Sequence, residues 1–533
     1  MMRRSSALAF LVVGSWYIAG GSGCGTTDDS CEARQRCGAG GTSTDASGGS
    51  AGVSPDGAGC DLSKSPAESM CVVDEAYGVF VSPNANAATA DGTRAHPYQS
   101  LMTALQSAKT AGKRVYACDD GTGYAEQLVI DAMLDGIGMY GGFSCSDWTY
   151  STTRRASVRA PTTTGVKISK LATGLTVQDF AFRAADATAK GESSIGVFVS
   201  ESRGVKFSRV TITAGKGAAG DSPPAVTPNA VTGMPGNKGN DACQPAVAPI
   251  GGMNTCASET SAGGPGGLGA TGSAIGGQGS TGSSTPMVAT PAGVGGKGEG
   301  DVVAGGQWDC LSTDHGMAQS GAPGPDGVAG VGATSSGTLD AAGWQLTAGA
   351  PGKDGHVGQG GGGGGGAKAP SVCGGDAAAP TGASGGSGGG GGCGGKGGGG
   401  GGSGGSSMAL VSLNSDVLLD TCDLAAANAG NGGNGAKGQQ GGVGGDGGHG
   451  GVGSSSKNAC SGGKGGDGGN GGNGGGGAGG HSLGIAYVGT QPMINDPMPT
   501  VGTAGIGGKD GAGLSTGPGA GAAGKAQANL EIK

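Results

Sequence analysis

The chain has few aromatic and few charged residues for its length. Phe, Trp and Tyr make up 4% of the 533 residues, and Asp, Glu, Lys and Arg make up 13%. Glycine supplies 131 residues, and glycine has no side chain to bury and loses the most backbone entropy on folding. Long stretches therefore cannot build an ordinary hydrophobic core. The apolar residues concentrate at 70–214 and in short segments further on.

Other shortages exclude whole classes of function. No basic patch with interleaved aromatic residues occurs and the formal net charge is −8, so we expect no nucleic-acid partner. The chain has five histidines and no Cys-x-x-Cys pair, so we expect no zinc site and no cofactor. No Gly-x-Ser-x-Gly elbow stands between a strand and a helix, which argues against a serine hydrolase.

The N-terminus is typical of an export signal. Arg3-Arg4 precede an apolar run over residues 7–18 that is too short for a comfortable membrane span. Small residues follow up to Cys24, and the segment resembles a bacterial lipoprotein signal, although Gly21 stands where a large aliphatic residue is usual. The resemblance implies a signal peptide over 1–23, lipidation of Cys24 and a membrane as partner. Simple secretion is the alternative.

The 14 cysteines point to an oxidising compartment. Spacing does not fix their connectivity, and the local pairs that we expect are Cys60–Cys71, Cys118–Cys145, Cys243–Cys256 and Cys422–Cys460. Together with the export signal, they predict a protein of the bacterial cell envelope, at the outer-membrane surface or secreted.

A unit of about 20 residues recurs four times at separated places in the chain. The copies begin at Gly165, Ser193, Ser406 and Ser482, and each carries alternating aliphatic residues that would face inward. One copy cannot bury its inner face alone, so we expect the four to stack into one core. The glycine-rich segments between them must then leave and return at the same corner.

The region before the first copy resembles a known family. The residues concerned are Val79-Phe80-Val81-Ser82-Pro83, the stretch 91–98, a helix predicted over 98–111 by the spacing of Leu101, Ala104, Leu105 and Ala108, and Tyr140-Gly141-Gly142-Phe143 with Trp148. They resemble the opening domain, itself of unknown function, of bacterial pectin-lyase-like proteins. The resemblance implies an all-β fold, a right-handed parallel β-helix with an N-terminal cap. Two long glycine-rich loops, disordered or polyglycine II-like, would interrupt it.

The second glycine-rich insert has a regular pattern. Glycine occupies every third position over 432–453 and again over 462–480, and three residues per turn is the period of the polyproline II helix. Faces made of glycine alone would let two such arms approach and pair through main-chain hydrogen bonds, with a turn over 454–461. The first insert is less regular, and a flexible loop and a polyglycine-helix bundle remain open for it. The composition is similar to that of PE-PGRS proteins, whose defining N-terminal domain is missing here.

The signal, the four copies and the glycine-rich inserts together predict the organisation of the chain. It comprises a signal peptide (1–23), a flexible Ser/Gly/Thr tether (24–70), a cap with the first turns of the β-helix (71–214), a glycine-rich insert (215–405), a further turn (406–427), a glycine-triplet insert (428–481), a last turn (482–503) and a glycine-rich tail (504–533).

Few residues qualify for catalysis. Pectin-lyase-like proteins often cleave acidic polysaccharides with carboxylates on neighbouring turns or with an arginine base. The candidates here are Asp119, Asp120, Asp179, Asp186, Arg183 and Arg209, with His96 expected to be structural. We expect Asp119 and Asp120 to form a turn between strands. Asp179 aligns with Arg209 between the strands of successive copies, and we expect this position to be solvated. Because no pair of carboxylates emerges, we assign no catalytic residue.

The sequence therefore favours a non-enzymatic, surface-exposed lipoprotein. Its β-helix would be a platform that presents the glycine-rich loops for adhesion or for contact with matrix or polysaccharide. A polysaccharide lyase or hydrolase is the alternative from another class, and a structural spacer in the envelope is the third.

Overall fold

The computed structural model describes residues 60–288, 292–300, 308–334, 337–341, 343–374, 380–454, 456–495 and 498–532. These belong to one compact unit, Cys60–Lys533. The expected signal peptide, the lipidation site Cys24 and most of the tether lie outside the described residues.

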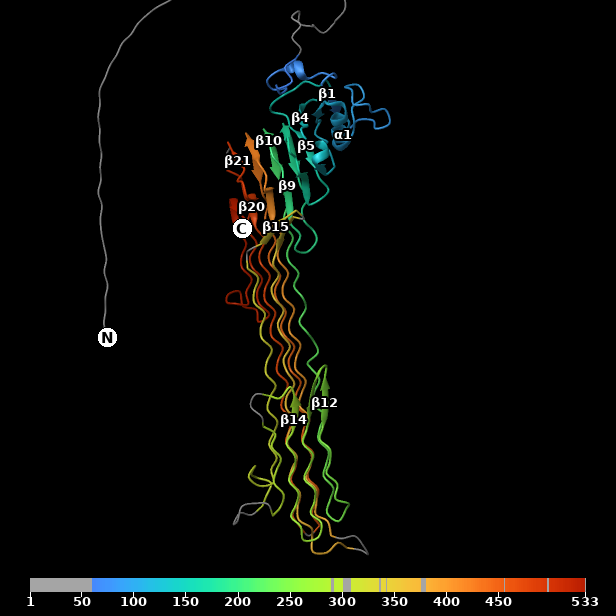
Figure 1. Cartoon of the computed structure of the whole chain (residues 1–533), viewed down its shortest axis with the longest axis vertical. Helices are drawn as coiled ribbons and strands as arrows, with labels where there is room; N and C mark the ends of the chain where they lie inside the picture. The colour runs from blue at the N-terminus through green and yellow to red at the C-terminus, as the bar shows by residue number, and fades with distance from the viewer. Residues whose placement is uncertain are drawn as a thin grey trace, which may run out of the picture. The chain divides into compact units, whose positions relative to one another are not determined.

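Most strands belong to three parallel sheets (Figure 1). The seven-stranded sheet contains, in spatial order, β1 (Gly78–Val81), β2 (Arg114–Cys118), β4 (Gly138–Phe143), β7 (Leu175–Gln178), β10 (Val205–Ser208), β18 (Val417–Asp420) and β21 (Met493–Ile494). The six-stranded sheet contains β3 (Leu128–Ile130), β6 (Thr164–Ser169), β9 (Ser194–Ser200), β17 (Ser407–Leu413), β20 (Ser482–Val488) and β22 (Ala526–Glu531). The four-stranded sheet contains β5 (Ala156–Arg159), β8 (Phe180–Arg183), β11 (Thr211–Thr213) and β19 (Asp423–Ala425).

The three sheets share one apolar core. Val166, Val197, Leu410 and Ile485 stand opposite one another in the six-stranded sheet and are all buried. Residues of the other two sheets, such as Phe207 and Ile212, complete the same cluster. The recurring copies therefore stack as the sequence predicts, because each one buries its aliphatic face only against the next.

One α-helix covers the start of this core. Helix α1 (Leu101–Ala111) buries the four residues whose spacing predicts it. Ser100 caps its N-terminus, where Ser100 Oγ accepts a hydrogen bond from Thr103 N at 3.3 Å. The carboxylate of Glu126 adds a second cap, accepting from Leu101 N at 2.6 Å. Gly112 ends the helix at a φ of 65°, a left-handed conformation that suits glycine.

The remaining elements are short. They are two 3-10 helices (Met70–Val72 and Ala132–Leu134), an antiparallel sheet of β12 (Met253–Cys256), β13 (Glu259–Ala262) and β14 (Ser283–Thr285), and an antiparallel pair of β15 (Gly337–Asp340) and β16 (Gly343–Leu346).

The glycine-rich segments run side by side as extended chains (Figure 1). Their main-chain hydrogen bonds recur at every third residue. In the second insert, the amides of Gly462, Gly465 and Gly468 donate to the carbonyls of Gly448, Gly445 and Gly442 at 2.8–2.9 Å. The predicted pairing of the two arms around a turn is therefore confirmed. The first insert is bonded in the same way, for example from Gly358 to Gly392 and from Gly361 to Gly389. We call these segments together the glycine array.

Close packing in the array requires glycine. A Cβ atom built on Gly388 would lie 1.9 Å from the carbonyl oxygen of Gly361, and one built on Gly361 would lie 2.1 Å from that of Gly463. Distances this short cannot be relieved by moving a side chain, because the obstructing atoms are backbone. The absence of side chains, which deprives these segments of an apolar core, is what lets their backbones bond to one another.

Serines join the array to the sheets. Ser194, Ser407 and Ser482 start β9, β17 and β20 in register and are fully buried. Each hydroxyl donates to the carbonyl of a chain leaving the sheets and accepts from the amide of the next chain. The donor bonds reach Ala185, Gly215 and Ala427, and the accepted bonds come from Gly215, Ala427 and Gly502, all at 2.7–2.9 Å. The segments thus leave and return at the same corner, as expected.

The predicted fold class is nevertheless wrong. The described residues do not form an all-β, right-handed parallel β-helix interrupted by two loops. They form separate parallel sheets of seven, six and four strands, an α-helix, small antiparallel sheets and a large array of hydrogen-bonded extended chains. The prediction treated the glycine-rich segments as interruptions, whereas main-chain hydrogen bonding makes them a principal part of the unit. The resemblance to pectin-lyase-like proteins stays a prediction.

The described residues contain five disulfides. Cys60–Cys71 and Cys118–Cys145 form as predicted. The pairs Cys243–Cys256 and Cys422–Cys460 are wrong, because the bonds are Cys243–Cys373, Cys256–Cys393 and Cys310–Cys460. Cys422 is buried, and its thiol donates to the carbonyls of Phe207 and Asp420 at 3.4 Å. Sequence proximity failed as a guide because the array brings residues more than a hundred positions apart into contact.

Candidate functional site

Asp179 and Arg209 are the catalytic candidates that the structure brings together. Arg209 Nε lies 2.8 Å from Asp179 Oδ1, and Arg209 Nη2 lies 2.9 Å from Asp179 Oδ2. Tyr150 donates its hydroxyl to Asp179 Oδ2 at 2.6 Å, and Arg155 Nη1 lies 3.3 Å from Asp179 Oδ1. The expectation that Asp179 is solvated is wrong, because its side chain is only 1% exposed.

This cluster is structural rather than reactive. The hydrogen bond and charge of Asp179 raise the pKa of the Arg209 guanidinium. Burial and the hydrogen bond to Asp179 raise the pKa of the Tyr150 hydroxyl. The carboxylate of Asp179 accepts from three side chains, two of which are the arginines that neutralise its charge. Its oxygens are therefore already engaged within the protein and are not available to bind a substrate. The cluster links neighbouring layers of the sheets.

The other predicted carboxylates accept hydrogen bonds from backbone amides and, at Asp120, also from the side chain of Asn84. Asp119 Oδ1 accepts from Gly121 N at 2.7 Å and Asp119 Oδ2 accepts from Ser157 N at 2.8 Å, which confirms a turn between strands. The amide and hydroxyl of Thr122 lower the pKa of Asp120. Asp186 accepts from Lys216 N at 2.9 Å.

The two remaining candidates are Arg183 and His96. Arg183 is exposed on β8, opposite Arg159 of β5. The side chain of His96 is half exposed, with Nδ1 3.8 Å from the carboxylate of Asp91. Within the part of the chain that the structure describes, no group of three or more His, Cys, Asp or Glu side chains is placed to hold a metal ion.

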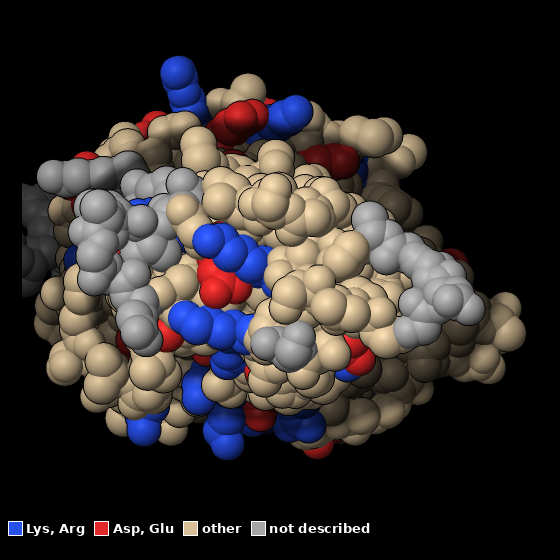
Figure 2. Space-filling model, turned by 90° about the horizontal axis from the view of Figure 1, so that it is seen from below, with Lys and Arg blue, Asp and Glu red and all other residues tan. Residues whose placement is uncertain are grey.

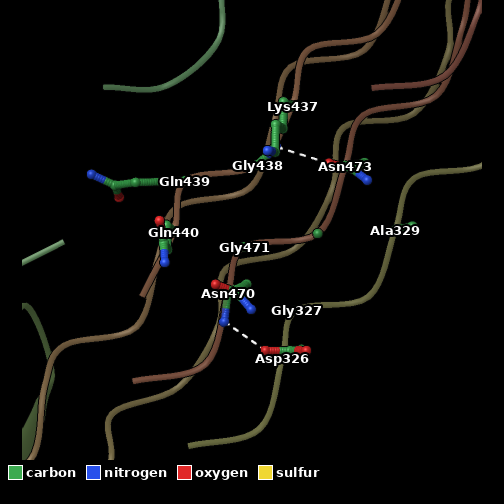
Figure 3. Close-up of a pocket in the computed structure, with 11 residues that line it drawn as sticks. Asp326, Gly327, Ala329, Lys437, Gly438, Gln439, Gln440, Asn470, Gly471 and Asn473 are labelled. Carbon is green, nitrogen blue, oxygen red and sulfur yellow. Dashed lines mark hydrogen bonds between the residues drawn. The ribbon is translucent and has the colours of Figure 1, made fainter. Parts of the chain in front are cut away.

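A polar hollow on the glycine array offers a better candidate site (Figure 3). Its volume is about 490 Å³. Three extended segments, 326–329, 437–440 and 470–473, form its walls. The side chains that line it are those of Asp326, Ala329, Lys437, Gln439, Gln440, Asn470 and Asn473.

The middle segment holds the other two in place. Gly327 N and Gly330 N donate to the carbonyls of Asn470 and Asn473 at 2.7 Å, and Gly471 N donates to the carbonyl of Gln439 at 2.8 Å. Asn470 and Asn473 therefore stand between the segment with Gln440 and the segment with Asp326 (Figure 3). The walls of the hollow are fixed by main-chain bonds rather than by the side chains that line it.

Asparagine and aspartate in the triplets have a specific role. The side-chain oxygens of Asn473, Asn470 and Asp467 accept from the amides of Gly438, Gly441 and Gly444 at 2.9–3.2 Å. Each triplet of the 438–444 arm thus has one amide that bonds to a side chain of the neighbouring arm. The side chains of Asn470 and Asn473 therefore bond to a neighbouring arm as well as lining the hollow. With the oxygens of Asn470 and Asn473 engaged in this way, their amide NH₂ groups are turned away from the backbone.

The hollow presents hydrogen-bonding groups of several kinds. Lys437 contributes an ammonium group, Asp326 a carboxylate that also accepts from Asn470 N at 2.6 Å, and Gln440, Asn470 and Asn473 contribute amides. Equivalent positions recur about 9 Å apart along a chain with three residues per turn and a rise near 3.1 Å per residue. Such a surface can bind many hydroxyl groups at once. It holds one carboxylate, so neither two-carboxylate mechanism of glycoside hydrolysis can be built from its lining residues.

Sequence reasoning missed this hollow because residues from three distant segments form it. The available signal was the recurrence of Asn and Asp at every third position over 467–473, which marks where side chains leave the array.

Charged side chains of both signs are exposed on one end of the molecule. Figure 2 shows Lys and Arg side chains beside Asp and Glu side chains on the face seen from below, with uncharged residues around them. This face carries charges of both signs rather than a field of one sign.

Two observations bear on location. The disulfides are consistent with an extracellular or envelope protein. Among the described residues, no helix has the length and hydrophobicity needed to cross a membrane.

Comparison of the chain with known protein families, curated proteins and solved structures found no match.

Proposed function

We propose that the protein is a non-catalytic scaffold of the bacterial cell envelope that contacts polysaccharide through its glycine array. The observation that carries this proposal is the hollow between the segments 326–329, 437–440 and 470–473. It combines amide, ammonium and carboxylate groups on a backbone that is already bonded within the array. Hydroxyl-rich polymers offer both donors and acceptors to such a surface.

Rigidity supports the same proposal. A flexible glycine-rich loop would lose backbone entropy on binding, whereas an array with main-chain bonds at every third residue has already lost it on folding. Three disulfides, Cys243–Cys373, Cys256–Cys393 and Cys310–Cys460, brace the array further. Lipidation at Cys24, which the sequence predicts, would tether this surface to a membrane.

The experiment uses the purified full chain and four polysaccharides, the acidic pectate and alginate and the neutral dextran and mannan. Retention on immobilised protein is measured, and the soluble fraction is analysed by mass spectrometry for new oligosaccharides. We expect at least one polymer to be retained and none to be cleaved. New oligosaccharides would overturn the non-catalytic part of the proposal, and absence of retention across the panel would overturn the polysaccharide part.

A variant pair tests the location. Lys437→Ala combined with Gln440→Ala removes two exposed side chains of the hollow. Lys509→Ala is the matched control, since Lys509 is an exposed lysine of the array outside the hollow. We expect about tenfold weaker retention by the double variant, about 1.4 kcal/mol of binding free energy for the two side chains together, and no change in the control. Equal retention by both variants would show that the polymer binds elsewhere.

A further inference from the structure

A second hollow, far in sequence from the glycine array, lies among residues 82–148. Its volume is about 530 Å³. It lies where the chain leaves β1, between the loop over 94–97, the turn with Asp120 and the segment after the disulfide Cys118–Cys145. The side chains that decide its chemistry are Asn84, Arg94, His96, Asp120 and Trp148.

Trp148 is held firmly but remains partly open to the hollow. Its ring meets Phe80 edge-to-face with centroids 4.8 Å apart, and the indole N–H donates to the carbonyl of Arg94 at 3.3 Å. The residue is intermediate in exposure, whereas Trp308 and Trp344 are buried. A fixed, half-open indole provides a flat apolar surface within a polar hollow.

The backbone of Trp148 is unusual as well. Its φ is 56°, in the left-handed region that bulky side chains seldom adopt. A glycine or an asparagine would occupy this position with less strain, so the backbone alone does not call for a tryptophan.

Polar side chains line the same hollow as the indole. Asn84 Nδ2 donates to Asp120 Oδ2 and lies 3.3 Å from Thr122 Oγ1, so the amide and the carboxylate stand side by side. The Thr122 amide and hydroxyl lower the pKa of Asp120, which keeps it an acceptor. On the other side, the Arg94 guanidinium packs over the Phe80 ring at 5.1 Å and donates to the carbonyl of Val73.

We propose that this hollow binds one pyranose ring of a saccharide, with the ring's C–H face on Trp148 and its hydroxyl groups on Asn84 and Asp120. A pyranose presents one flat C–H face and a rim of hydroxyls that both donate and accept, which matches an indole beside an amide and a carboxylate. The site is independent of the hollow in the glycine array, and neither needs the other to be correct.

The test is a fluorescence titration of the full chain with three tetrasaccharides, built of glucose, N-acetylglucosamine and galacturonate. Binding at Trp148 is expected to change the tryptophan emission and to protect it from a soluble quencher. Trp148→Ala should weaken binding at least tenfold, and Asp120→Asn should weaken it about fivefold. Trp148→Phe keeps part of the packing on Phe80 and should remove the fluorescence change while retaining some affinity by calorimetry.

Controls separate binding from folding and from the other site. Asp147→Asn is matched to Asp120→Asn, because both carboxylates accept from the threonine two residues on, Thr149 and Thr122, yet Asp147 does not line the hollow. It should bind like the native chain, as should the Lys437→Ala and Gln440→Ala double variant. If no tetrasaccharide binds, or if folded Trp148→Phe and Asp120→Asn variants bind with native affinity and an unchanged signal, the proposal is overturned.

Discussion

The carboxylate of Asp179 and the guanidinium of Arg209 form a two-point ion pair across neighbouring layers of the structure. Their contacts are 2.8 and 2.9 Å long, and Asp179 is completely buried. Both residues adopt left-handed backbone conformations, with φ values of 60° and 52°. They lie between β7 and β8 and between β10 and β11, where Thr421 holds the same place in the next layer with a φ of 55°. The pair thus fixes a corner at which the chain changes sheet.

Asp179→Asn should destabilise the protein by about 3–5 kcal/mol, because it leaves Arg209 without its buried counter-charge. Asparagine tolerates the left-handed conformation, so the substitution removes charge with little added backbone strain. The free energy of unfolding in urea measures the loss. Asp186→Asn is the control, since Asp186 accepts only from Lys216 N among the described residues and should change stability by less than about 0.5 kcal/mol. Equal effects would show that the ion pair adds nothing.

Stability should fall in alkali, because burial raises the pKa of Tyr116 to about 12 and raises those of Tyr124 and Tyr140. Below about pH 10 these phenols are protonated in both states. Between about 10 and 12 the unfolded chain loses its protons first, so the unfolded state is favoured as pH rises. Unfolding free energies at pH values across this window check the slope. Tyr116→Phe removes one titrating group and should make the slope shallower, and an unchanged slope would exclude Tyr116 as a cause.

Gly388→Ala should destabilise the glycine array by about 3 kcal/mol, because its Cβ would lie 1.9 Å from the Gly361 carbonyl oxygen. The two chains could accept it only by separating and losing main-chain bonds on either side. Gly374→Ala is the matched control, since a Cβ there meets nothing within 4 Å. It should be neutral or slightly stabilising, because alanine restricts the unfolded chain. Thermal unfolding of the two variants compares them directly, and similar melting temperatures would contradict the packing argument.

Breaking Cys256–Cys393 should cost more stability than breaking Cys60–Cys71. The first bond spans 137 residues and the second 11, and the entropy that a crosslink removes from the unfolded chain grows with the loop it closes. Replacing both cysteines of each pair by serine makes the same chemical change at both places. We expect the difference in unfolding free energy to be about 1–2 kcal/mol, since the other disulfides of the array already shorten the longer loop. Denaturant unfolding measures it, and a larger loss from the shorter loop would reverse the argument.

Local patterns predicted local structure well, and distant pairings poorly. The spacing of Leu101 and Leu105 predicted α1, and the Ser406 and Ser482 copies predicted stacking, because each signal lies within one segment. The partner of Cys243 was missed because it is set by which distant segments become neighbours. The alignment of Asp179 with Arg209 was correct, but it was wrongly interpreted as a solvated position, because burial depends on the layers around the pair. Strand β22 was missed because polar residues at Gln527, Asn529 and Glu531 leave its segment without a clear apolar pattern, so it was assigned to the C-terminal tail. The hollow at Asn470 needs three segments at once, and the triplet period fixes the geometry of each without saying which ones meet.

Hydrogen exchange can test whether the triplet asparagines are structural. Asn470 Oδ1 accepts from Gly441 N at 3.2 Å, so Asn470→Ala should leave that amide open to water and speed its exchange. The amides of Gly438 and Gly444 bond to Asn473 and Asp467 instead and should exchange as before. Asn470→Asp keeps an accepting oxygen and should restore slow exchange at Gly441. If the native chain and both variants protect Gly441 equally, the amide of Gly441 is shielded by chain packing, and the recurrence of asparagine would then reflect only what the array presents to a ligand.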